Sequence, residues 1–419
     1  MISSYLPYPL FSGGHIRLFN IIKRLSKNHD ITLICEKRNY QTEKDLKEVE
    51  KFCKKVVAIE RRKQWSFSNI VKAGISFYPF LVVGHTNELL KQAISQVLNN
   101  EKFDLIHVET FYVHQNIPPT ELPIVVVEHN IEYLVYKRFA DKAPVFLRPL
   151  LYYDVIKLKR LEEEAWKKAA KLVAVSEQEK SLMKRENVIV VPNGVDTKKY
   201  QISNIKYQIS KKEKRILFIG DFKWVENRDS VRWIIKDIWP KIKLSFWSEG
   251  EARTIESHRE KGDAILYRTP SSRVQHDIGL KLWVVGRNIP DSIKKLTTDN
   301  SIIFDENAPS DTRLIYQKAD MLLSPIRIGG GTSFKILEAM ASGVPVVTTS
   351  LGNDGIGARE DEEILIAKDD NDFVYKTINL LQDIKLYEKI SKNSRKLIEE
   401  KFDWDKIVEK LEEVYESVI

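Results

Sequence analysis

Cysteine is scarce in this chain of 419 residues, which contains only Cys35 and Cys53. Two cysteines cannot form a disulfide framework, and their surroundings lack the spacing of a zinc site. Cys35 ends an apolar, strand-like run, and Cys53 lies in a helical stretch. We therefore expect both to be buried, reduced thiols of a cytoplasmic protein.

Long apolar runs are also missing. No stretch of about 18 consecutive apolar residues occurs, so no membrane-spanning helix is expected. The first residues, MISSYLPYPLFSGG, have neither the basic start nor the apolar core of a signal peptide. Residues 137–168 mix Lys and Arg with Phe, Leu and Tyr and could lie against the inner face of a membrane. A long helix packed on its own domain is the favoured alternative.

The motifs of common cofactor and metal sites are absent as well. The chain contains no GxxxxGK[ST] loop, and its glycine-rich loop does not match GxGxxG. No cluster of His, Cys, Asp and Glu has metal-ligand spacing, and residues 369–372 (DDND) are typical of a turn. We expect no metal and no cofactor. The net charge of +8 favours anionic ligands, but no basic stripe interleaved with aromatic residues points to nucleic acid.

Short, continuously apolar runs rich in β-branched residues are abundant and alternate with helical patterns. This order predicts parallel strands covered by helices on both faces, and hence a doubly wound α/β fold. The runs are residues 31–35, 56–60, 104–109, 123–129, 171–176, 188–194, 215–220, 281–286, 301–306, 320–325, 345–350 and 364–367.

The length and the pattern predict two domains. We expect the first over residues 1–198, with a truncated first strand, and the second over 215–401. Residues 199–214 are polar, contain the sequence KYQIS twice and are interpreted as a linker. Residues 245–278 are arginine-rich and interpreted as an insertion. Residues 402–419 form an amphipathic helix.

A glycine-rich loop, 326-IRIGGGT-332, follows the run 320–325. Ser333 or Thr332 can cap the following helix, which should end near Ser342, with Gly343 just beyond it. Unpaired N–H groups at a helix start favour an anion. By itself the loop fits a phosphate site and a tight turn equally well.

The stretch 331-GTSFKILEAMASGVPVVTTSLG-352 resembles the donor-binding helix of retaining glycosyltransferases of the GT-B fold, family 4. Further segments resemble that family in the same order along the chain: 5–25, 126–134, 173–183, 190–200, 218–240 and 402–416. The resemblance implies two Rossmann-like domains that face each other across a cleft, with the C-terminal helix crossing back to the first domain. It also implies transfer of a sugar from a nucleotide-diphosphate sugar to a glycan or lipid-linked acceptor.

The resemblance also assigns candidate site residues. Glu338 would accept hydrogen bonds from the ribose hydroxyls of the donor, and Lys335 and Arg327 would offset the charge of the diphosphate. The backbone around the glycine loop would bind the diphosphate through Gly330, Gly331, Thr332 and Ser333.

In the first domain, the resemblance places His129 near the transferred sugar, where it would donate a hydrogen bond to a hydroxyl; the alternative is a structural histidine. Gly13 and Gly14 would lie near the phosphate and sugar. His107 is a weaker candidate.

Two positions depart from the family. Gly330 stands where many members have a glutamate. The usual Arg and Lys after the first strand of the second domain are unclear, with Lys223 and Arg228 as candidates and Arg287 as a substitute. Two other functions stay open: a nucleotide-sugar epimerase or hydrolase of the same fold, and a non-catalytic nucleotide-sugar-binding protein.

Overall fold

The computed structural model describes residues 1–200, 213–247, 279–307, 309, 311–329 and 331–419. Most of the predicted linker and insertion, and Gly330, lie outside the described residues. The chain divides into two compact units. Unit 1 consists of Met1–Gly194 and Lys401–Ile419, and unit 2 consists of Val195–Glu400.

Unit 1 contains a parallel sheet of seven strands in the order β3-β2-β1-β4-β5-β6-β7. Its strands are β1 (Ile2–Ser3), β2 (Thr32–Lys37), β3 (Lys55–Glu60), β4 (Ile106–Glu109), β5 (Ile124–Glu128), β6 (Lys171–Ala174) and β7 (Val188–Val190). Its helices are α1 (Gly13–Leu25), α2 (Glu43–Glu50), α3 (Phe67–Ile75), α4 (Phe80–Val83), α5 (Glu88–Asn100), η1 (Phe111–Asn116), α6 (Glu132–Lys142), η2 (Val145–Leu147), α7 (Arg148–Lys168), α8 (Glu177–Met183) and α17 (Trp404–Glu416).

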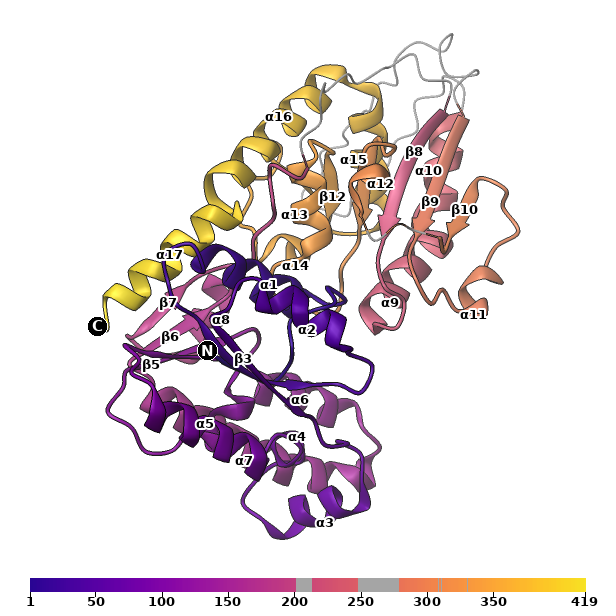
Figure 1. The fold of residues 1–419 in the computed structure, drawn as a ribbon. Helices are drawn as coiled ribbons and strands as arrows, with labels where there is room; N and C mark the ends of the chain where they lie inside the picture. Colours follow the sequence, from indigo (N-terminus) through magenta and orange to yellow (C-terminus); the bar gives the residue numbers. More distant parts are fainter. Residues whose placement is uncertain (201–212, 248–278, 308, 310, 330) are drawn as a thin grey trace. The chain divides into compact units, whose positions relative to one another are not determined.

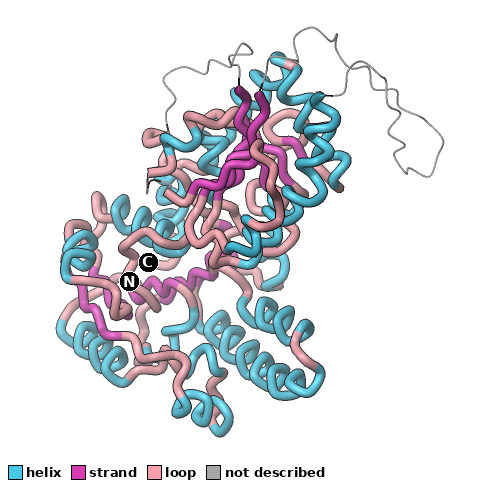
Figure 2. Tube along the Cα trace, turned by 90° about the vertical axis from the view of Figure 1, so that its right-hand side faces the viewer, coloured by secondary structure: helices cyan, strands magenta, loops and turns pink. Residues whose placement is uncertain are grey.

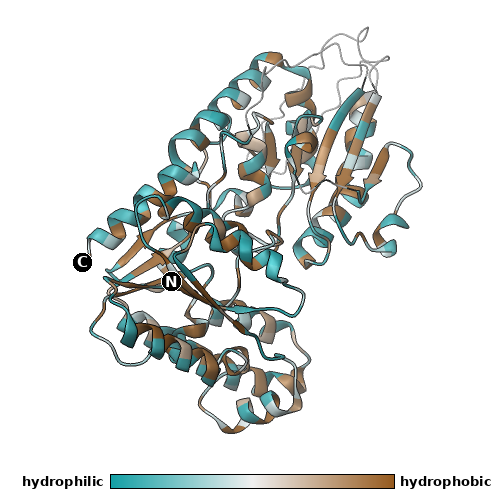
Figure 3. Cartoon of the chain, in the orientation of Figure 1, coloured by the Kyte–Doolittle hydropathy of each residue, from teal (hydrophilic) through white to brown (hydrophobic). Residues whose placement is uncertain are grey.

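Helices cover both faces of this sheet, with α1 and α17 on one face and α5 and α7 on the other (Figure 1). The strands are mainly apolar (Figure 3), as a doubly covered sheet requires. Side chains at helix starts replace missing backbone partners; Thr42, for example, forms a capping box with Asp45 at α2. The stretch expected to form one helix is broken into α6, η2 and α7, because Pro144 cannot donate a backbone hydrogen bond.

Unit 2 contains a parallel sheet of six strands in the order β10-β9-β8-β11-β12-β13. Its strands are β8 (Glu213–Ile219), β9 (Gly279–Val285), β10 (Ile302–Asp305), β11 (Met321–Ser324), β12 (Val346–Thr348) and β13 (Leu365–Ile366). Its helices are α9 (Val225–Trp233), η3 (Ile234–Ile238), α10 (Trp239–Trp247), α11 (Asp291–Lys294), α12 (Arg313–Tyr316), α13 (Phe334–Ala341), α14 (Ser350–Asn353), α15 (Asp370–Gln382) and α16 (Ile384–Lys401), which ends at the boundary with unit 1.

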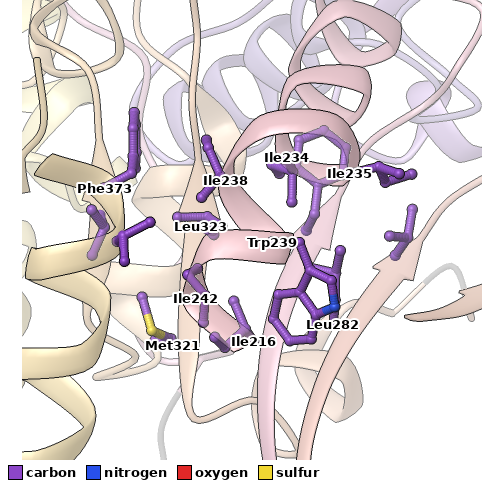
Figure 4. Close-up of a cluster of buried hydrophobic side chains, with 14 of the residues drawn as sticks. Ile216, Ile234, Ile235, Ile238, Trp239, Ile242, Leu282, Met321, Leu323 and Phe373 are labelled. Atoms are coloured by element: carbon purple, nitrogen blue, oxygen red, sulfur yellow. The ribbon is translucent and has the colours of Figure 1, made fainter. Parts of the chain in front are cut away.

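In unit 2, helices lie beside the strands of the sheet (Figure 2). The hydrophobic core is formed by side chains of both (Figure 4). Ile216, Leu282 and Met321 of the sheet lie with Trp239 and Phe373 of the helices, all fully or almost fully buried. Each predicted apolar run overlaps one of the strands β2 to β13, so the predicted doubly wound α/β fold is confirmed. Among the described helices, none has the length and apolar composition needed to cross a bilayer.

Candidate functional site

A buried carboxylate joins two histidines at the carboxyl ends of β4 and β5 in unit 1. His107 and Glu109 are two residues apart on β4 and therefore share one face of the strand. The Nε2 atom of His107 lies 2.8 Å from Oε2 of Glu109, and Nε2 of His129 lies 2.6 Å from Oε1. The Glu109 side chain is fully buried, whereas His129, just after β5, is 20% exposed.

The groups around Glu109 favour the ionised form of its carboxyl group. Burial alone would raise its pKa, but His129 first of all, and then His107, lower the pKa below the ordinary value. The carboxylate can therefore only accept hydrogen bonds, so both Nε2 atoms donate to it. Burial lowers the pKa of His107, which keeps its ring neutral, and its Nδ1 accepts from the Tyr415 hydroxyl at 2.6 Å.

These bonds fix which nitrogen His129 can offer to a ligand. Because Nε2 is bound to Glu109, the neutral ring presents an acceptor at Nδ1, and only the protonated ring presents a donor there. The expectation that His129 donates to a sugar hydroxyl therefore holds for the protonated ring alone.

Arg17 of α1 is the cation that accompanies this carboxylate. It is fully buried, and its Nε lies 3.8 Å from Oε1 of Glu109. The guanidinium donates to the carbonyl oxygens of Val191 and Pro192 at 3.0 and 2.8 Å. It thereby holds α1 against the segment that follows β7.

The start of α1 lies close to His129. Gly13 is the first residue of this helix. A Cβ on Gly14 would lie 3.0 Å from Oη of Tyr5 and 3.5 Å from Cε1 of His129, so a side chain there would crowd both groups. The Tyr5 hydroxyl is buried and has no hydrogen-bond partner among the described residues, which leaves a donor beside His129.

In unit 2 the glycine loop connects β11 to α13, as predicted. Ser333 is the N-cap of α13 but makes no side-chain capping bond, and the helix ends before Gly343, whose φ is 65°. Gly331 has a φ of 73°, a conformation that glycine adopts readily. Thr332 is buried, and its hydroxyl donates to the carbonyl oxygen of Gly355 at 3.2 Å.

Lys335, in the first turn of α13, points toward α9 and the end of β8. Its Nζ donates to Oδ1 of Asn227 at 2.5 Å and lies 4.9 Å from the centre of the Phe218 ring. Burial lowers its pKa to about 8, so the amine is still mainly cationic at neutral pH. No carboxylate of the described residues forms an ion pair with it.

Glu338 lies one turn further along α13. Its Oε2 accepts hydrogen bonds from the hydroxyls of Thr312 and Tyr316, both at 3.1 Å, and Thr312 is in turn 2.7 Å from the hydroxyl of Tyr200. Burial raises the pKa of Glu338, although these hydroxyls oppose the shift. The carboxylate is thus positioned by neutral donors and not by a cation.

The two arginines that the resemblance assigns to unit 2 make different contacts from Lys335. Arg327 forms a bidentate pair with Asp229 of α9, at 3.0 and 2.9 Å, and stacks over Trp233, 4.3 Å from the ring centre. Its guanidinium is therefore already partnered. Arg287 is exposed at the end of β9, and its carbonyl oxygen accepts from the backbone N–H of Phe222.

Several residues of these clusters were not found by sequence reasoning. Glu109, Arg17 and Tyr415 are far apart in sequence, and the available local signal was the His-x-Glu pattern of β4. Asn227 and Tyr316 carry no recognisable motif. Among the described residues, no group of three His, Cys, Asp or Glu side chains could hold a metal ion.

Comparison with known families assigns a domain type to each half of the chain. A model described as Glycosyltransferase Family 4 matches residues 11–199, and one described as Glycosyl transferases group 1 matches residues 213–383. Together the two models match most of the chain.

Two curated relatives are similar over most of their length. An uncharacterized 44.6 kDa protein in the cps region of Klebsiella pneumoniae is 23% identical over 97% of both chains. The UDP-Gal:alpha-D-GlcNAc-diphosphoundecaprenol alpha-1,3-galactosyltransferase of Escherichia coli is 22% identical over 79% of this chain and 80% of the relative.

Solved structures share the fold. Sucrose-phosphate synthase from Thermosynechococcus elongatus has a TM-score of 0.65 at 13% identity, with 99% of this chain and 98% of the other covered. HepE of Anabaena, in complex with UDP and glucose, has a TM-score of 0.61 at 14% identity, with 99% of both chains covered. The domain matches and the fold agree: this chain is built from glycosyltransferase domains and has the GT-B fold.

Proposed function

We propose that the protein is a retaining glycosyltransferase that moves a hexose from a UDP-sugar to a hydroxyl of a glycan or of a lipid-linked sugar. The choice of UDP rests on the Escherichia coli relative, named for UDP-Gal, and on HepE, solved with UDP and glucose. The relative's name, which includes a diphosphoundecaprenol-linked sugar, supports a lipid-linked acceptor.

The environment of Lys335 is the observation that best supports a donor site in unit 2. Burial lowers the pKa of this half-buried amine to about 8. Glu226 acts on it electrostatically, but no described carboxylate pairs with it, so an anion would offset its desolvation cost. Lys335 lies in the first turn of α13, where N–H groups without intrahelical partners and the helix dipole also favour negative charge. A diphosphate satisfies both requirements, together with the backbone of Gly330, Gly331, Thr332 and Ser333.

Glu338 binds the ribose in this proposal. A carboxylate accepts hydrogen bonds from two neighbouring hydroxyls, and these charge-assisted bonds are stronger than those between neutral groups. Tyr316 and Thr312 hold the carboxylate through Oε2, so that it is oriented before the donor arrives.

Unit 1 supplies His129 to the reaction. The bond between the anomeric carbon and the phosphate oxygen breaks, a bond from that carbon to the acceptor oxygen forms on the same face, and the acceptor proton goes to the departing phosphate. His129 positions a sugar hydroxyl through Nδ1, while Glu109 fixes its ring. We propose that Lys335 and the start of α13 stabilise the leaving diphosphate without a resident metal.

Incubation with UDP-sugars and candidate acceptors tests this function. A thermal-shift screen first identifies the UDP-sugar that raises the melting temperature. Proton NMR of the product then reports the configuration of the new bond, with and without EDTA. We expect the donor's α configuration to persist and EDTA to have no effect. An inverted bond, or hydrolysis of the sugar at the same rate without an acceptor, would overturn the proposal.

A further inference from the structure

Unit 1 exposes an unusual number of large apolar side chains in one region. Phe67 and Ile75 of α3 are 82% and 83% exposed, and Phe77, just after this helix, is 87% exposed. On the neighbouring segment, Phe146 of η2 is 80% exposed, and Ile156 of α7 is also exposed. Soluble monomers rarely expose apolar side chains in such numbers without a binding role.

The apolar residues of α3 follow the helical repeat on the outer face. Phe67, Ile70, Val71 and Ile75 are all exposed, whereas Asn69 and Ala73 are buried. The helix thus turns a polar side chain inward and its apolar stripe outward, the reverse of a surface helix that packs on its own domain.

α3 and α7 form one continuous surface. The buried Lys157 of α7 donates to the carbonyl oxygens of Ala73 and Tyr78, at 2.5 and 3.3 Å. The guanidinium of Arg160 lies 6.0 Å from the centre of the Phe77 ring. Figure 1 shows α3, α6 and α7 together at one end of unit 1. We call residues 62–80 and 135–160 the basic apolar surface.

This surface also carries the excess charge of the chain. Residues 62–80 contain three Lys or Arg and no acidic residue, and residues 135–160 contain seven Lys or Arg and two Asp. The resulting net charge of +8 equals that of the whole chain, so the remainder is neutral overall.

A hollow opens beside the surface and shares its residues. It has a volume of about 880 Å³ and is lined by, among others, Phe77, Lys157 and Arg160. The buried Nε2 of His114 at its wall has no hydrogen-bond partner among the described residues. The region therefore combines apolar contact, positive charge and space for a polar group.

We propose that the basic apolar surface docks on a bilayer of anionic lipids, with the apolar side chains of α3 and η2 entering the interface. Apolar insertion and attraction of Lys and Arg to anionic headgroups reinforce each other in such binding. A second copy of the chain is a poorer occupant, because a symmetric dimer would bring two surfaces of the same charge together. This inference goes beyond the proposed reaction and does not depend on it.

Sedimentation of the whole protein with vesicles tests the proposal without any sugar substrate. We expect binding to vesicles containing phosphatidylglycerol, at least tenfold weaker binding to pure phosphatidylcholine, and a steep loss of binding in 0.5 M NaCl. The variant Phe67→Ser/Phe77→Ser/Phe146→Ser should lose at least tenfold in affinity. A matched triple of exposed apolar residues elsewhere, Leu182→Ser/Leu244→Ser/Ile419→Ser, should bind like wild type.

Charge-reversal variants provide a second test in the same vesicle-binding experiment. Lys72→Glu/Lys142→Glu should weaken binding at least tenfold, whereas Lys318→Glu/Lys392→Glu, the same charge change in unit 2, should have less than a twofold effect. Melting temperatures establish that each variant is folded. Absence of binding, equal binding to both lipids, or equal losses in the matched variants would overturn the proposal. A dimer in solution that the Phe triple variant dissociates would assign the surface to a second copy instead.

Discussion

The two units differ in how they balance the charged side chains near the carboxyl ends of their sheets. In unit 1, the Glu109 carboxylate is surrounded by His107, His129 and Arg17, so its charge is balanced within the unit. In unit 2, the amine of the half-buried Lys335 has, among the described residues, only the neutral Asn227 as a hydrogen-bond acceptor. We infer from this difference that unit 1 holds a side chain in position, and we propose that unit 2 receives an anion.

Removing the central carboxylate of unit 1 should have the largest effect on stability. Glu109→Leu leaves Arg17 buried without its carboxylate, which we expect to lower the free energy of unfolding by about 3–5 kcal/mol. Urea denaturation measures this change. The counterpart in unit 2, Lys335→Met, removes a partly desolvated amine that pairs with no described carboxylate, and it should leave stability unchanged or raise it by about 1 kcal/mol. Similar losses in both variants would remove the contrast between the units.

His129→Ala should have the largest effect on turnover. We expect kcat to fall about 10²–10³-fold, within the range for loss of a group that acts on the reacting centre. Donor affinity should stay within about twofold of wild type, because in our proposal unit 2 binds the diphosphate and the ribose. Steady-state kinetics and calorimetry separate the two effects, and parallel losses in both would make His129 a structural residue.

Glu338→Ala should weaken UDP-sugar binding by about 1.5–3 kcal/mol, the cost of losing charge-assisted hydrogen bonds. Tyr316→Phe is the matched control, because it removes one donor to Oε2 but keeps the carboxylate; its loss should be smaller. Calorimetric titration measures both. An unchanged affinity in Glu338→Ala would refute the ribose assignment.

The pH dependence of donor binding should report Lys335. Its pKa in the free protein is lowered to about 8, so the amine loses its proton as the pH rises through 8. A bound diphosphate raises this pKa, so affinity should fall by up to about tenfold per pH unit above pH 8 and stay level below it. Lys335→Met should abolish this slope; a slope that persists would assign the titration to another group.

The fold and the place of the glycine loop between a strand and a helix could be predicted from local patterns. Continuous apolar runs mark buried parallel strands, and the stop at Gly343 follows from its positive φ. The bonding of Arg327 could not be predicted, because Asp229 and Trp233 lie on α9, far from this loop in the sequence. The Glu109 cluster was missed for the same reason: Arg17, His129 and Tyr415 meet only through the fold.

Calorimetric titration of a UDP-sugar into wild type, Lys335→Met and His129→Ala at pH 7 tests the central claim most directly, because it asks which unit binds the donor. The structure predicts that Lys335→Met binds at least about tenfold more weakly, the loss of one charge-assisted contact, and that His129→Ala binds like wild type. Unchanged affinity in Lys335→Met, together with a loss in His129→Ala, would contradict the assignment of the diphosphate to unit 2.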